Sequence, residues 1–168
     1  EAYEKPVLAI QKADEQMGVV VSRTHHVVWE RSGSFLMNSI AGIEMQKAGG
    51  QITNLAACAS MVLKANHISV DAAALAKKKA AVYPMLAQYM EEPMNLTGAT
   101  LEQVLYFVSN NKYVIAMTGD STAVVISGYD TKNITVYDPA TGKVTTMKRT
   151  QAENLFKDNG NSFFSYLN

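Results

Sequence analysis

The sequence predicts an α+β domain in which helices come first and an antiparallel sheet follows. Helical patterns dominate the chain up to about residue 112, and four short β-branched segments separated by turns follow between residues 113 and 149. The chain has 168 residues, of which 48% are hydrophobic. A chain of this length and composition is typical of one globular domain with a substantial core.

The first third of the chain mixes helix and strand signals. Pro6 marks a helix start and Gly18 a helix end, while the following segment is rich in β-branched residues. Gly49 and Gly50 form a clear break before the next helix. The expected elements are a helix over residues 6–18, one or two strands over 19–34 ending in a Ser-Gly turn, and a segment of undecided structure over 35–50.

The strongest helix signal covers residues 53–67. Thr53 or Asn54 can cap its start, because a side-chain oxygen there accepts a hydrogen bond from an unpaired backbone N–H. Its apolar residues recur at helical spacing and form one stripe: Leu55, Cys58, Ala59, Val62 and Leu63.

The remaining elements follow in regular order. One or two helices are expected over residues 69–90, interrupted before Pro84, and a further helix over 97–111. Thr100 and Gln103 form a capping box at the start of the latter. The sheet is expected from strands at 113–119, 122–129, 133–139 and 143–149, then a helix at 150–160 and a last strand at 162–167.

Charge and composition exclude several classes of function. Lys plus Arg equals Asp plus Glu at 15 each, so nothing favours nucleic acid as a partner. No apolar run is long enough to span a bilayer. With one cysteine and three histidines at no ligand spacing, we expect no metal site, and without a glycine-rich phosphate loop we expect no cofactor.

A series of motifs resembles a known family. A capped helix with "MVL" precedes "VDAAALA", then "LTGATLEQVLYFVSNNKYVIAMTG", then the hairpin "TAVVISGYDTKNITVYDPATG". In this order, over roughly residues 48–167, the chain resembles the bacteriocin-processing, double-glycine type of papain-like cysteine peptidase. The resemblance implies a papain-like fold, with N-terminal helices packed on a C-terminal antiparallel sheet.

The resemblance also implies positions for a catalytic set. In such enzymes a cysteine at a helix N-terminus is the nucleophile, a histidine is its base, an acid orients the histidine, and an upstream Gln stabilises the oxyanion. Anchoring on "MVL" places the nucleophile slot at Asn54, and anchoring on Gln51 places it at Ala57. Thr122 occupies the histidine slot and Asp138 the acid slot.

Cys58 and Asp138 each have two interpretations. Cys58 is either a small buried hydrophobic residue in the apolar stripe or a nucleophile reached by a one- or four-residue shift of register. Asp138 is either the orienting acid or a turn residue before Pro139. For an active Cys58, the base would have to come from His25 or His26, which on a strand would point to opposite faces.

We therefore expect a catalytically inactive papain-like domain that binds a peptide or leader segment in a cleft lined by Gln51, Asn54, Ala57, Thr122 and Asp138. The alternatives are an active cysteine peptidase using Cys58 and a structural module of a bacterial surface protein. Residues 1–168 would form one domain, with 1–47 as an N-terminal arm of helix and strand and 48–168 as the papain-like core. A start at Glu is consistent with a mature or truncated chain, and one cysteine fits a cytosolic protein as well as a bacterial secreted one. The location is left open, with a bacterial secreted or cell-surface protein favoured over a cytoplasmic one.

Overall fold

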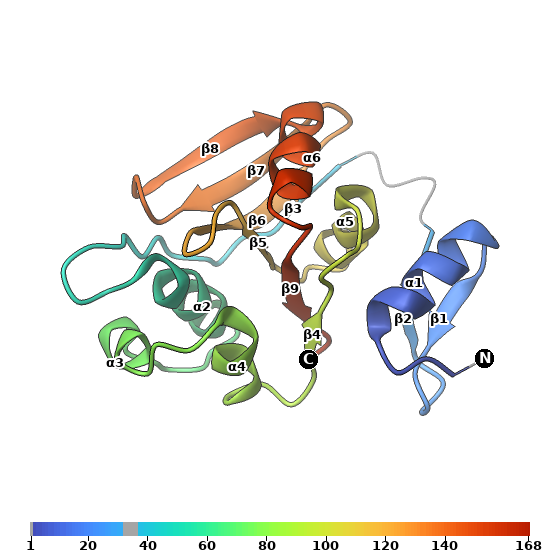
Figure 1. The fold of residues 1–168 in the computed structure, drawn as a ribbon, viewed down its shortest axis with the longest axis horizontal. Helices are drawn as coiled ribbons and strands as arrows, with labels where there is room; N and C mark the ends of the chain where they lie inside the picture. Colours follow the sequence, from blue (N-terminus) through green and yellow to red (C-terminus); the bar gives the residue numbers. More distant parts are fainter. Residues whose placement is uncertain (1, 32–36) are drawn as a thin grey trace.

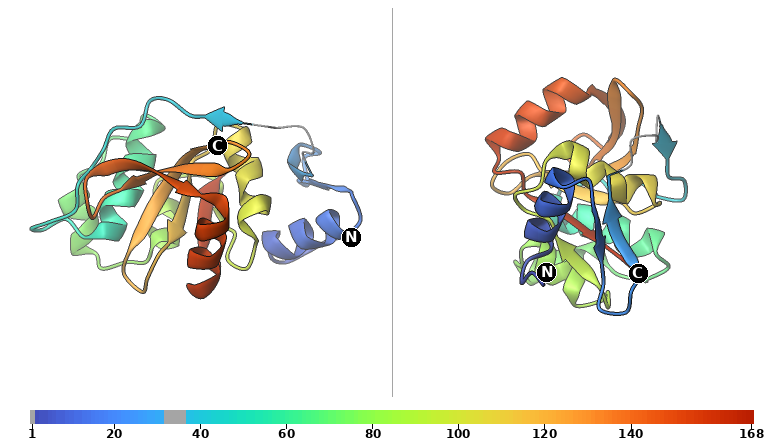
Figure 2. Two further views of the ribbon diagram at one scale, coloured as in Figure 1. Left: turned by 90° about the horizontal axis from the view of Figure 1, so that it is seen from above. Right: turned by 90° about the vertical axis from the view of Figure 1, so that its right-hand side faces the viewer.

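A computed structural model describes residues 2–31 and 37–168 of the chain. Its main feature is a mixed layer arrangement in which helices cover both faces of one antiparallel sheet (Figures 1 and 2). The helices are α1 (Pro6–Glu15), α2 (Asn54–Ala65), α3 (Ala72–Lys77), α4 (Val82–Ala87), α5 (Leu101–Ser109) and α6 (Arg149–Asp158). The strands are β1 (Val19–Val21), β2 (Val27–Glu30), β3 (Asn38–Ser39), β4 (Pro93–Asn95), β5 (Val114–Met117), β6 (Ala123–Tyr129), β7 (Asn133–Asp138), β8 (Lys143–Lys148) and β9 (Phe163–Tyr166).

The sheet has the strand order β4-β9-β5-β6-β7-β8, and β3 pairs with one end of β6. Every described pairing is antiparallel. All seven residues of β6 are buried, as expected for a central strand covered on both faces. The predicted α+β class and the four strands after residue 112 are confirmed.

Two hydrophobic clusters fill the space on the two faces of the sheet. The first joins the sheet to α5, α6 and the N-terminal segment, around Phe107, Phe156 and Phe163. The second joins the other face to α2, α3 and α4, around Leu63 and Leu86. No helix of the described residues is long and apolar enough to span a membrane.

The N-terminal segment consists of α1 and a separate two-stranded sheet of β1 and β2. Trp29 on β2 is only 2% exposed, and its indole Nε1 donates to the Gln103 carbonyl oxygen at 2.9 Å. Asp14 on α1 accepts hydrogen bonds from the Arg31 Nε and the Gln103 Nε2. Burial alone would raise the pKa of Asp14, but the hydrogen bonds from Gln103 and Arg31 outweigh it and lower that pKa. These contacts fix the N-terminal segment to the start of α5.

Several local predictions are confirmed and a few are wrong. The capping box of Thr100 and Gln103 is present with both of its hydrogen bonds. The histidine pair is not on a strand: His25 and His26 lie in the turn between β1 and β2, where His25 has a φ of 66°. Strand β4 was not predicted. The expected interruption before Pro84 is present over residues 78–81, and Pro84 lies in the first turn of α4. The predicted Ser-Gly turn near residue 33 lies outside the described residues.

Candidate functional site at the junction of α2 and β6

The junction begins at the N-terminus of α2. Thr53 caps the helix, and its side chain accepts from the Ala56 N–H at 3.3 Å. Asn54 is the first residue of the helix, so its side chain stands at the helix end that faces the sheet. Gln51 is exposed in the preceding turn, which the mutual backbone hydrogen bonds of Gly49 and Ile52 close.

Ala123, the first residue of β6, pairs with Met117 on the β5 side but has no partner on the β7 side. The β6–β7 register pairs Val125 with Tyr137, so two residues further on Ala123 would lie opposite Pro139, as the next hydrogen-bonded pair. Proline has no N–H to donate, and the Pro139 carbonyl oxygen already accepts from the Ala48 N–H at 2.8 Å. The ladder therefore ends here, and a buried residue is left with an N–H and a carbonyl that need partners.

Two side chains of α2 supply these partners. The Asn54 Oδ1 accepts from the Ala123 N–H at 2.8 Å, and the Cys58 Sγ donates to the Ala123 carbonyl oxygen at 3.4 Å. Asn54 and Cys58 are four residues apart, so they lie one above the other on the same face of the helix. Both polar groups of the Ala123 peptide are thus satisfied by the helix, and α2 is held against β6.

The thiol of Cys58 is fully buried in this arrangement. Its residue has no exposed surface, and it lies one turn inside α2 rather than at the helix end. Burial raises the pKa of the Cys58 thiol far above its usual range, and the negative charge of Asp138 raises it further. The sulfur is therefore a protonated hydrogen-bond donor at neutral pH.

Thr122 lies beside the junction but turns its hydroxyl to the tip of the β5–β6 turn. Thr122 is exposed, and its Oγ1 lies 3.1 Å from the Oγ1 of Thr118. The same oxygen occupies the space next to Gly119, where an added Cβ would lie 2.6 Å from it. The hydroxyl therefore packs within its own turn, and no hydrogen bond joins it to Asn54 or Cys58.

Asp138, at the end of β7, makes local turn contacts. Its Oδ1 accepts from the Ala140 N–H at 3.0 Å, and its Oδ2 accepts from the Thr141 Oγ1 at 3.0 Å. These contacts are those of an Asp that stabilises its own turn. The carboxylate is nonetheless close enough to Cys58 for its charge to act on the thiol.

The structure thus gathers some of the predicted site residues and not others. Asn54 and Cys58 both bind Ala123, the charge of Asp138 acts on Cys58, and Thr122 adjoins Ala123 in sequence. Ala57 is fully buried in α2. The turn with His25 and His26 lies at the opposite end of the molecule from α2 (Figure 1). Within residues 2–31 and 37–168, no group of three His, Cys, Asp or Glu side chains is placed to hold a metal ion.

Comparisons with known proteins identify the fold. No protein-family model matches the sequence, and no curated protein matches it either. Among solved structures, the chain resembles a crystal structure of a "putative C39-like peptidase" from Bacillus anthracis, with a TM-score of 0.60 and 17% identity. The similarity covers 78% of this chain and 94% of the other.

The chain has an α+β papain-like fold. At this level of identity the resemblance establishes the arrangement of helices and strands alone. The catalytic chemistry has to be considered residue by residue.

Sequence reasoning overlooked Ala123, the residue on which the junction depends. Alanine carries no side-chain chemistry, so no motif search would select it. The available signal was indirect: an Asp-Pro at the end of a strand removes one N–H from the ladder and leaves the neighbouring strand short of a partner.

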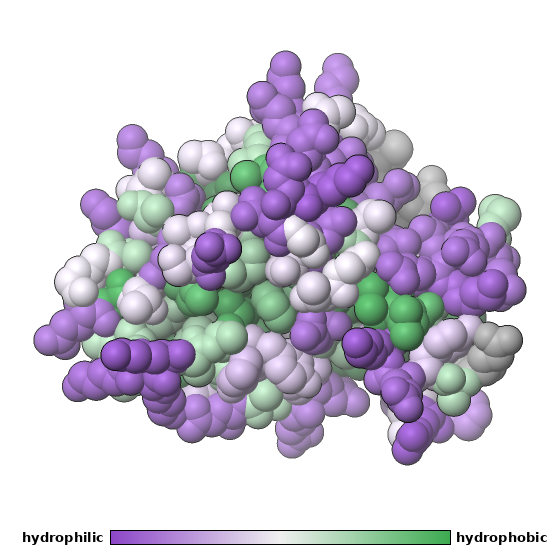
Figure 3. Space-filling view, in the orientation of Figure 1, coloured by the Kyte–Doolittle hydropathy of each residue, from purple (hydrophilic) through white to green (hydrophobic). Residues whose placement is uncertain are grey.

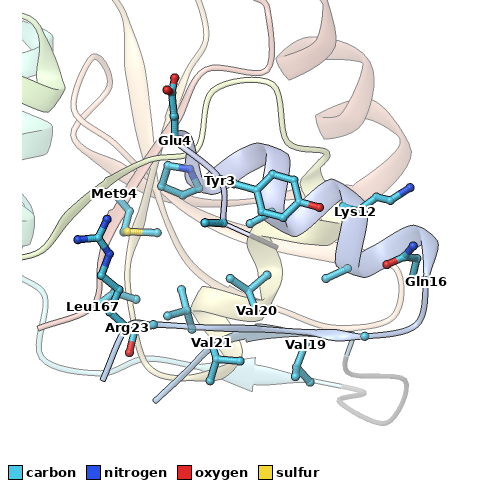
Figure 4. Close-up of a pocket in the computed structure, with 17 residues that line it drawn as sticks. Tyr3, Glu4, Lys12, Gln16, Val19, Val20, Val21, Arg23, Met94 and Leu167 are labelled. Carbon is cyan, nitrogen blue, oxygen red and sulfur yellow. The ribbon is translucent and has the colours of Figure 1, made fainter. Parts of the chain in front are cut away.

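The largest cavity described lies away from this junction, between α1 and β1 (Figure 4). It has a volume of about 690 Å³. Val20 points into it from β1, whereas Val19 and Val21 point to the other side, and Met94 and Leu167 lie at one end beside Arg23 (Figure 4). Hydrophobic residues are also exposed at the surface over α1 (Figure 3). None of the three cavities described is lined by Asn54, Cys58, Thr122 or Asp138.

Proposed function

We propose that this chain is a non-catalytic papain-like domain of a bacterial secreted or cell-surface protein that binds a peptide segment without cleaving it. The observation that carries the proposal is the pair of hydrogen bonds from Asn54 and Cys58 to Ala123, called here the clamp on Ala123. Asn54 stands where the resemblance places a nucleophile, and its amide oxygen is occupied by the Ala123 N–H at 2.8 Å. An amide is not a nucleophile for peptide bonds, and a threonine at position 122 is not a base near neutral pH.

The geometry around Cys58 argues against an active thiol peptidase. A thiol nucleophile requires a lowered pKa, exposure to substrate and a base within hydrogen-bond reach. Cys58 has a raised pKa and no exposed surface. His25 and His26 belong to a turn at the far end of the molecule, and His67 follows the C-terminal end of α2 (Figure 1).

A peptide-cleavage assay tests the inactivity. The purified protein is incubated with a peptide that carries a Gly-Gly junction and with a matched Ala-Ala peptide, and the products are followed by mass spectrometry. We expect both peptides to stay intact. Cleavage that disappears in Cys58→Ala would overturn the proposal in favour of an active cysteine peptidase.

A binding assay on the same peptides, extended to a display library of random peptides, tests the second half of the proposal. We expect enrichment of a defined set of peptides on the immobilised protein. Absence of any enriched peptide would favour a structural module instead. The filled junction supports this second candidate, because Ala57 and Cys58 are both fully buried there.

A further inference from the structure

Strand β8 leaves one edge of the main sheet open. It is the last strand in the order, and among the described residues only β7 pairs with it. Five of its six residues are exposed, with Met147 half-buried, and Val144 retains 50% of its surface. An exposed strand of six residues at a sheet edge is a template for one more strand.

The register identifies the backbone groups on the open edge. The Arg149 N–H donates to the Lys132 carbonyl oxygen at 2.8 Å, which makes Asn133 and Lys148 a non-hydrogen-bonded pair of the β7–β8 ladder. Alternate residues of β8 therefore direct their N–H and carbonyl groups away from β7. These outward residues are Val144, Thr146 and Lys148. The Lys148 carbonyl caps the start of α6, so the edge offers three donors and two acceptors to a further strand.

Cationic side chains flank the edge at both ends. Lys143 and Lys148 end the strand and Arg149 follows it, while the side chain of Lys47 packs against Gly142 in the β7–β8 turn. The two ion pairs of the described residues involve none of these cations.

The nearby carboxylates are already engaged. Asp130 accepts the N–H groups of Lys132 and Asn133, each at 2.7 Å, and Asp138 accepts from its own turn. Both carboxylates keep their negative charge, but Lys47, Lys143, Lys148 and Arg149 outnumber them, so the net charge of these flanks is positive.

From these observations we propose that the open edge of β8 binds an extended, acidic peptide segment of another protein, which adds to the sheet as a further strand beside β8. The inference rests on the proposed peptide-binding function and names its surface. Main-chain hydrogen bonds to Val144, Thr146 and Lys148 give the affinity, and the flanking cations select acidic residues at the ends of the segment.

A second copy of the chain fits this edge poorly. The longest antiparallel pairing of two β8 edges is centred on Thr146. It places Lys143 of each copy directly opposite Arg149 of the other, so like charges face one another at both ends. Charge complementarity therefore favours an acidic partner over self-association.

The test uses fluorescein-labelled Glu-Glu-Val-Thr-Val-Glu-Glu and its basic counterpart Lys-Lys-Val-Thr-Val-Lys-Lys, with binding followed by fluorescence anisotropy. Thr146→Pro removes one outward N–H without touching the β7 ladder, and Thr146→Ala keeps that N–H while removing the side chain. We expect the acidic peptide to bind the wild type in preference to the basic one. Thr146→Pro should weaken binding at least about fivefold relative to Thr146→Ala.

Two further measurements test the site without the proline variant, in case that variant misfolds. The double variant Lys143→Glu/Lys148→Glu leaves the backbone intact and should weaken the acidic peptide about tenfold while improving the basic one. An acidic peptide N-methylated at its central Thr and both Val residues should bind at least about fivefold more weakly than the unmodified one.

Each alternative result has a definite meaning. Equal binding to Thr146→Pro and Thr146→Ala, with the charge variant also unchanged, would overturn the β8 site while leaving peptide binding elsewhere intact. No binding of either peptide to the wild type would also overturn it, whereas the proposed function fails only if the display library yields no binder. A dimer in sedimentation velocity that Thr146→Pro dissolves would assign the edge to a second copy.

Discussion

Replacing Asn54 by Ala should destabilise the protein by removing the acceptor of the Ala123 N–H. The bond is short at 2.8 Å, and Ala123 is only 1% exposed, so solvent does not readily replace the lost oxygen. Leaving a buried donor unsatisfied costs about 1–3 kcal/mol. We expect a loss of about 2 kcal/mol, which for a domain of this size lowers Tm by about 4–8 °C.

Urea unfolding followed by circular dichroism measures this loss, with the slope of the transition compared between variants. Asn54→Asp is the matched control, because a carboxylate keeps an acceptor at the same position and suits the first turn of a helix. It should lie within about 0.5 kcal/mol of the wild type. An Asn54→Ala variant as stable as Asn54→Asp would refute the role assigned to the clamp on Ala123.

Three further changes test other contacts. The Cys58 thiol has a raised pKa in the folded chain, so the unfolded chain loses its thiol proton first as pH rises. The contribution of this thiol to the free energy of unfolding is therefore complete below about pH 8.5. Above that pH it falls by up to about 1.4 kcal/mol per pH unit. Urea unfolding between about pH 8 and pH 10.5 should thus show a steeper fall for the wild type than for Cys58→Ala, and equal slopes would contradict the burial of the thiol. Gly119→Ala should lose about 1–3 kcal/mol of stability in thermal melts, because its Cβ would lie 2.6 Å from the Thr122 Oγ1. The double variant Gly119→Ala/Thr122→Ala should recover most of this loss, and a double variant as unstable as Gly119→Ala would contradict the clash. Trp29→Phe should cost about 1–2 kcal/mol by removing the donor to the Gln103 carbonyl oxygen, and limited proteolysis should then cut the β1–β2 hairpin faster; an unchanged digestion pattern would contradict the proposed anchor.

Local signals were sufficient to predict most of the elements. The caps of α2 and α5 were visible in Thr53 and Thr100, and the alternation of β-branched residues revealed β5 to β8. These features depend on residues close together in sequence. The short strand β4 could not be found in this way, since it has only three residues, the first of which is Pro93, and its strand partner β9 is distant in sequence.

The junction was harder to predict because its chemistry depends on contacts distant in sequence. Asn54 was identified as a slot, but its bond spans 69 positions to a residue that carries no functional group. The surroundings of Cys58 were equally hidden: periodicity indicated a buried face, whereas the donation to the Ala123 carbonyl oxygen depends on where the β6–β7 ladder stops.

Positions 54 and 122, the two expected catalytic slots, both adjoin the end of the β6–β7 ladder. Pro139 leaves Ala123 without a hydrogen-bond partner on the β7 side, and Asn54 supplies the acceptor that the Ala123 N–H then requires. A cysteine at position 54 would offer only a weak sulfur acceptor, and a thiolate there would need a base that Thr122 does not provide. The amide at position 54 therefore does structural work in this chain that a catalytic thiol would perform poorly. A cysteine and a histidine introduced at positions 54 and 122 would leave the Ala123 N–H without its amide acceptor, and this loss would have to be offset before any catalysis could begin.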